Sequence, residues 1–135
     1  MSSEAGRLPP AYRPMTLVDL ADHLAAAEDD RHRWRLVAEF LEEYRHEPDE
    51  ARAGLLADEP HSTRDDRWDV FLAALAEHLA TRDARGPAAW TASRRLEVFW
   101  FPFNTAAARV DAVVHAPASF RSRGIFIAPE ELGVA

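Results

Sequence analysis

Histidines are the residues of this chain best suited to acid–base chemistry or metal binding, because imidazole titrates near neutral pH and often ligates metals. Glu43 and His46 show the Glu-x-x-His spacing of di-iron helical bundles. That site needs the motif twice and inward-facing, whereas this pair falls opposite the apolar stripe of its predicted helix. His23 and His78 sit at the edges of apolar stripes, which is typical of histidines hydrogen-bonded at a core boundary. We therefore predict no metal and no cofactor.

Paired acids are a second candidate chemistry, and the chain has several, including 29–30 and 65–66. Glycosidase-type catalysis needs two carboxylates about 5–10 Å apart across a cleft, one with a raised pKa. Adjacent acids at helix starts more simply complement the helix dipole. The motifs Gly-x-Ser-x-Gly, Ser-x-x-Lys and His-Glu-x-x-His are all missing. We predict a protein that is not an enzyme, with a small enzyme carrying a dispersed site as one alternative.

The composition excludes further classes of protein and of functional site. The chain has 135 residues, 47% of them hydrophobic and 29% charged, which indicates one globular domain. It has no cysteine, and all 16 basic residues are arginine, so thiolate sites and lysine Schiff bases are excluded. Residues 1–85 carry 11 arginines against 19 acids, a balance of −8, while residues 86–135 carry 5 against 4, a balance of +1. An acidic body argues against nucleic-acid binding without an added DNA-binding domain.

The first residues form a predicted flexible lead-in, residues 1–15, with prolines at Pro9, Pro10 and Pro14. They contain no continuous apolar stretch of the kind found in a signal peptide. No apolar run approaches the roughly 18 residues of a membrane-spanning helix. The sequence therefore predicts a cytoplasmic protein without a membrane partner, folded as a single helical domain over residues 16–135.

Apolar residues recur at helical spacing through residues 16–83, which predicts four amphipathic helices. The first follows an N-cap at Thr16, with Asp19 completing a capping-box pattern. The second and third cover about 30–47 and 48–57. The fourth covers about 64–83, with Ser62 or Thr63 as its N-cap and a stop at Gly86–Pro87. Together they predict a mainly α fold, a small bundle of four to six helices.

The C-terminal part differs in character. Residues 96–101 are aromatic and β-branched, which favours a strand or a buried extended segment, and they could form one short two-stranded pairing with residues 125–127. Residues 104–115 form a predicted helix, with Asn104 as its cap and Ala107, Val110 and Val114 on its apolar stripe. Gly124 is the predicted C-cap of a helical turn over 117–123, and residues 129–132 form a further turn.

Seven Trp and Phe side chains crowd into residues 90–126. Most are predicted core, and the remainder, flanked by arginines, has the composition of a protein-interaction hot spot. The predicted partner-binding residues are Trp100, Phe101 and Phe126 as apolar anchors, with Arg121 and Arg123 as charged contacts. The same arginines and rings suggest, as an alternative, a nucleic-acid-binding regulator that stacks on a single strand, although two arginines make a small footprint.

Four stretches carry a resemblance to a known group: residues 67–80, 87–90, 99–102 and 115–127, with the Pro-Ala-x-Phe-Arg-x-Arg-Gly-Ile-Phe run as the most specific piece. They resemble small actinobacterial antitoxin-like proteins and the C-terminal domain of helix-turn-helix regulators found beside nucleotidyltransferase-like toxins. The resemblance covers about residues 16–132 and lacks the helix-turn-helix half. It implies a non-enzymatic protein of antitoxin type that binds and restrains a partner protein, with such a toxin as the suggested partner, and it transfers no catalytic residue.

Overall fold

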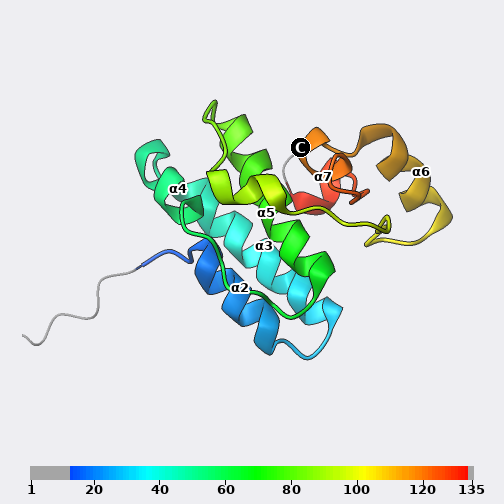
Figure 1. The fold of residues 1–135 in the computed structure, drawn as a ribbon, viewed down its shortest axis with the longest axis horizontal. Helices are drawn as coiled ribbons and strands as arrows, with labels where there is room; N and C mark the ends of the chain where they lie inside the picture. The colour runs from blue at the N-terminus through cyan, green and yellow to red at the C-terminus, as the bar shows by residue number, and fades with distance from the viewer. Residues whose placement is uncertain (1–12, 134–135) are drawn as a thin grey trace, which may run out of the picture.

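The computed structural model describes residues 13–133, and these residues form a mainly helical bundle, as predicted (Figure 1). The elements, in chain order, are α2 (Leu17–Ala26), α3 (Asp30–His46), α4 (Asp49–Leu56), α5 (Asp66–Arg82), the 3-10 helix η1 (Ala89–Ser93), α6 (Ala106–His115), α7 (Ala118–Arg121) and the 3-10 helix η2 (Pro129–Leu132). No helix within residues 13–133 is long and apolar enough to cross a membrane.

The start of α2 forms through the predicted capping box. The Thr16 hydroxyl accepts from the Asp19 amide at 3.1 Å, and the Asp19 carboxylate accepts from the Thr16 amide at 3.1 Å. That backbone hydrogen bond is the first cause of a lowered pKa at Asp19. Most of the predicted flexible lead-in, residues 1–12, lies outside the described residues. Its last residue is ordered, because the Met15 amide donates to the Glu43 carboxylate at 2.7 Å.

The connection into α5 differs from the prediction in its cap. Asp65, rather than Ser62 or Thr63, is the N-cap, and its carboxylate accepts from the Arg67 amide at 2.9 Å. Thr63 instead gives both its amide and its hydroxyl to the Asp69 carboxylate, at 2.6 and 2.7 Å. Because Asp69 already holds that loop, α5 begins at Asp66, two residues later than predicted.

The end of α5 also precedes the predicted stop. The helix ends at Arg82, and Ala84 adopts a left-handed backbone with φ of 59°. The Arg85 amide then turns back to the Ala80 carbonyl at 2.8 Å, which closes the last turn before Gly86 is reached. Alanine therefore occupies a position that glycine commonly takes.

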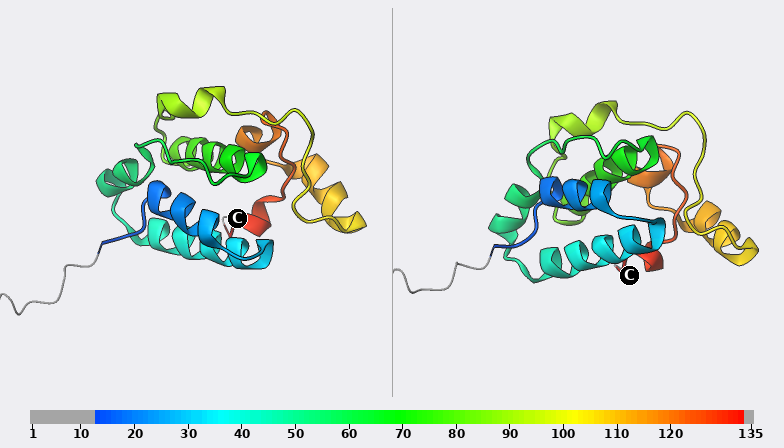
Figure 2. Two further views of the ribbon diagram at one scale, coloured as in Figure 1. Left: turned by 60° about the horizontal axis from the view of Figure 1, so that its bottom comes forward. Right: turned by 90° about the horizontal axis from the view of Figure 1, so that it is seen from below.

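The core is built around α5, which packs against α2, α4, α7 and η1. Trp68, Phe71, Leu72 and Leu75, which form most of its predicted stripe, are fully buried. Figure 2 shows α2 and α3 lying side by side along one flank of α5. Trp34 of α3 closes the aromatic part of this core, with its ring 4.8 Å from that of Trp68 and 5.0 Å from that of Phe103.

The C-terminal segment forms no strand among the described residues. The expected pairing is reduced to a single parallel bridge between Trp100 and Ile125. The Trp100 amide donates to the Gly124 carbonyl at 2.8 Å, and the Phe126 amide donates to the Trp100 carbonyl at 2.9 Å. Pro102, two residues after Trp100, stands where the next amide would donate and has no amide hydrogen, so the pairing stops there.

The helix α6 begins one residue later than its predicted cap allows, because Thr105 rather than Asn104 is the N-cap. The Thr105 hydroxyl accepts from the Ala108 amide at 3.1 Å. The Asn104 side chain instead accepts from Arg109. Figures 1 and 2 show α6 projecting from one end of the bundle, and it makes no extensive contact with the other described helices.

Candidate protein-interaction surface

The structure divides the five predicted partner-binding residues between the interior and the surface. Trp100 and Arg123 are buried, with 8% and 7% of their surfaces exposed. Phe101 and Phe126 are half-buried, and Arg121 is exposed. Trp100 belongs to the core, where its ring lies 5.4 Å from that of Trp68. Trp100 and Arg123 therefore act first on the fold rather than at its surface.

Arg123 joins three elements of the fold. Its guanidinium forms an ion pair with the Glu77 carboxylate of α5. It also donates to the Thr91 carbonyl in η1 and to the Ser119 carbonyl in α7, both at 2.9 Å. These bonds direct its donors inward. The motif that carries the resemblance thus has a structural role at Arg123.

Arg121 is the last residue of α7, and its side chain reaches the end of α6. Its guanidinium donates to the Val113 and Val114 carbonyls, both at 3.3 Å. A cation at a helix C-terminus satisfies free carbonyls and complements the dipole. Arg121 therefore ties the projecting helix to α7 while its side chain remains exposed.

Three phenylalanines form a short ladder beside α6. The rings of Phe101 and Phe126 stack at 5.1 Å, and Phe99 meets Phe126 edge-on at 5.2 Å. The Arg109 guanidinium lies 4.2 Å from the centroid of Phe101 and so connects α6 to the ladder. The outer end of the ladder is open to solvent, because Phe99 is 68% exposed.

The outward face of α6 is the largest departure from the sequence prediction. Val110 and Val114, expected on the apolar stripe, are 66% and 60% exposed, and Val113 beside them is 52% exposed. The whole face comprises Ala106, Ala107, Val110, Val113 and Val114. At about 100° per residue these five positions span about 120° of the helix. The inner face is made of small residues instead, with Ala112 and the following Ala116 buried. We call the five outward residues the α6 valine face.

Sequence reasoning missed this surface because periodicity marks an apolar face without showing whether anything covers it. A usable signal was nevertheless present. On the opposite face, alanine repeats at Ala108, Ala112 and Ala116, and small residues allow close packing against a neighbour. When a helix has apolar residues on both faces, only one face can pack against its own bundle, and the other remains exposed.

Charged side chains of both signs border the α6 valine face. The half-buried Asp111 lies beside its valines, and two exposed arginines, Arg109 of α6 and Arg121 of α7, lie on α6 and at its end. Asp111 is bonded at 2.8 Å to His115. This region belongs to the C-terminal part with a balance of +1, in a protein with a net charge of −7.

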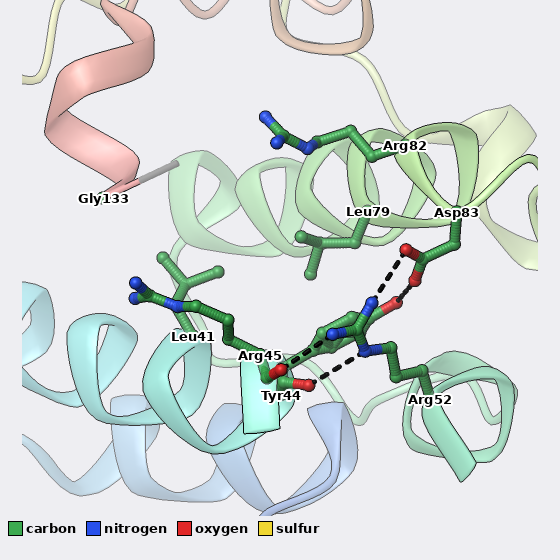
Figure 3. A pocket seen from close by; sticks show the side chains of 8 residues that line it. All are labelled: Leu41, Tyr44, Arg45, Arg52, Leu79, Arg82, Asp83 and Gly133. Carbon is green, nitrogen blue, oxygen red and sulfur yellow. Dashed lines mark hydrogen bonds and ion pairs between the residues drawn. The ribbon is translucent and has the colours of Figure 1, made fainter. Parts of the chain in front are cut away.

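A polar cluster lies between the ends of α3 and α5 (Figure 3), at the opposite end of the bundle from α6 (Figure 1). The Tyr44 hydroxyl donates to Asp83 at 2.7 Å, and Arg52 and Arg85 donate to the same carboxylate at 3.0 and 3.1 Å. Burial by itself would raise the pKa of Asp83, but these three donors outweigh it and lower that pKa. Burial and the bond to Asp83 raise the pKa of Tyr44, which stays protonated.

His78 of α5 is a half-buried histidine. Burial, and then the charge of Arg82, lower its pKa. Its Nε2 is buried without a hydrogen-bond partner within residues 13–133, and its ring packs 5.6 Å from that of Phe120. Burial and the neighbouring Arg82 cation thus both favour the neutral form of His78. Across the described part of the chain, no three metal-binding side chains gather at one point.

No family model, curated protein or solved structure matches this chain. The resemblance to antitoxin-like proteins is therefore still a prediction, and the functional argument rests on the surface just described.

Proposed function

We propose that this is a non-enzymatic protein of antitoxin type, which binds and restrains a partner protein in the cytoplasm. The observation that carries the proposal is the α6 valine face, with Val110 and Val114 66% and 60% exposed on a helix that projects from the bundle. An exposed apolar helix face beside aromatic residues has the composition of a protein-interaction surface. A partner that covers this face would bury apolar surface that the fold leaves exposed, which favours binding.

The charges near this surface favour one kind of partner. Arg109 and Arg121 lie on α6 and at its end, so a complementary surface would be apolar at its centre with carboxylates at its rim. The acidic body, with a balance of −8 over residues 1–85, would repel such a partner elsewhere and direct it to the C-terminal part. A nucleotidyltransferase-like toxin is the partner that the resemblance suggests.

Co-expression with the protein encoded beside this one tests the proposal directly. We expect the two to co-purify as a complex at a fixed ratio in size-exclusion chromatography. The variants Val110→Asp and Val114→Asp place a charge in the centre of the α6 valine face and should weaken binding at least tenfold, since a buried unpaired carboxylate is costly. Ala38→Asp is the matched control, because it adds the same charge at an exposed position of α3.

The fold of each variant is checked by circular dichroism, and all three should match the wild type because the altered side chains are exposed. A failure of the two full-length proteins to associate would refute the antitoxin role. If both valine variants bound the partner as tightly as the wild type, the binding surface would lie elsewhere than on the α6 valine face.

A further inference from the structure

A cleft with a volume of about 330 Å³ opens between α3 and α5, away from α6 (Figure 3). Its apolar wall is formed by Leu41 and Leu79 with the ring of Tyr44, and three arginines line it: Arg45, Arg52 and Arg82. This volume falls within the range of small-molecule sites. Asp83 is the acid among the lining residues.

The charge of Asp83 is already used inside the fold. One carboxylate oxygen accepts from Arg52 at 3.0 Å, and the other accepts from Arg85 at 3.1 Å and from the Tyr44 hydroxyl at 2.7 Å. Asp49 lies near the same two guanidinium groups, 3.9 Å from that of Arg52 and 3.6 Å from that of Arg85, so two acids balance two arginines. Among the described residues, neither acid forms an ion pair with the other two arginines that line the cleft.

Arginines near a helix C-terminus often donate hydrogen bonds to its free carbonyls, but here other donors already bind those carbonyls. Arg52 donates to the Tyr44, Arg45 and Glu47 carbonyls at the end of α3, at 2.7–3.2 Å. At the end of α5, the backbone amides of Ala84 and Arg85 return to carbonyls of the last turn at 3.0 and 2.8 Å. The carbonyls therefore do not hold the guanidinium groups of Arg45 and Arg82.

Arg45 and Arg82 come from opposite walls of the cleft, and Figure 3 shows both side chains extending toward the side where Gly133 lies. Within residues 13–133, Arg82 forms no ion pair, and Arg45 pairs at 3.1 Å with Glu42, which is exposed.

We propose that this cleft binds a small organic phosphate, with the phosphate between Arg45 and Arg82 and an apolar body against Leu41, Leu79 and the Tyr44 ring. One arginine can satisfy both oxygens of a carboxylate side by side. A phosphate monoester carries three free oxygens and up to two negative charges, so it can accept from guanidinium groups on two helices. The site is independent of the α6 surface and of the proposed antitoxin role.

Calorimetric titration of the full chain with phenyl phosphate, inorganic phosphate and benzoate, at constant ionic strength, tests the site. We expect phenyl phosphate to bind more tightly than inorganic phosphate, because its ring contacts the apolar wall, and more tightly than benzoate. Arg45→Gln and Arg82→Gln should each weaken phenyl phosphate binding about tenfold, as expected for a lost hydrogen bond to a charged group. Both side chains are exposed, so the variants should fold normally.

Arg35→Gln is the matched control, because it removes an exposed arginine from α3 outside the cleft. It should leave binding unchanged. Three results would overturn the proposal: no heat of binding with phenyl phosphate, an equal loss in the Arg35→Gln variant, or benzoate binding as tight as that of phenyl phosphate. The second would show diffuse charge attraction, and the third a general anion site.

Discussion

Arg123 forms an ion pair with Glu77, a residue 46 positions earlier in the chain. The pair links α5 to the turn that follows α7, and the same guanidinium reaches the Thr91 carbonyl of η1. The side chain of Arg123 is 8% exposed and that of Glu77 is 30% exposed, so the pair lies at the inner edge of the surface. It determines how the C-terminal segment sits on the bundle.

Loss of this pair should destabilise the fold. Arg123→Gln is expected to lower the free energy of unfolding by about 1–3 kcal/mol, since it removes hydrogen bonds from a buried charged donor, while solvent reaches the partly exposed Glu77 carboxylate. Urea unfolding followed by tryptophan fluorescence measures it. Arg121→Gln is the control, because that exposed arginine should contribute less than about 1 kcal/mol. Equal losses in the two variants would contradict the structural role of Arg123.

Two glycines should respond to alanine in opposite directions. Gly124 has a φ of 87°, and an added Cβ would lie 3.4 Å from the Cβ of Leu96, so Gly124→Ala should cost about 1–2 kcal/mol. Gly54 lies within α4, where an added Cβ meets nothing within 4 Å. Gly54→Ala should therefore stabilise by about 0.5–1 kcal/mol. Urea midpoints of the two variants that shift the same way would count against these conformations.

His78 should make stability depend on pH near neutrality. Burial and Arg82 lower its pKa in the folded state below the ordinary value of 6.5, so below that pH the unfolded chain binds the proton more readily. Stability due to this group is thus complete above pH 6.5 and falls as the pH drops toward the folded-state pKa. Free energies of unfolding measured from pH 8 to pH 5 should fall in the wild type and fall less in His78→Phe. Parallel curves would exclude His78 as the cause.

Asp83 should make the free energy of unfolding depend on pH in the acidic range, below that of His78. Its pKa is lowered below 3.8, because Tyr44, Arg52 and Arg85 outweigh the effect of burial. Its contribution is therefore present above that pH and lost as the pH falls through the folded-state pKa. Asp83→Asn should cost about 1–3 kcal/mol at pH 7, and the difference from the wild type should shrink below about pH 4. A difference that stays constant with pH would show that charge is not involved.

Local sequence signals determined most of the helical bundle. The capping box of Thr16 and Asp19 and the apolar stripe of α5 involve residues three or four apart, so their physical causes lie within a single helix. The predicted ranges of α2 to α5 are accordingly close to the observed ones. The errors fell on the caps, where Asp65 and Thr105 compete with neighbouring polar residues for the same amides.

The tertiary structure alone decided which residues of the C-terminal part are available at the surface. Arg123 is buried because Glu77, far away in the sequence, supplies its counter-charge, and no local pattern shows such a partner. Val110 and Val114 are exposed because the alanine face of α6 turns toward the bundle. The sequence by itself thus determined the helices and the apolar faces, whereas burial and exposure depended on contacts between residues distant in the chain.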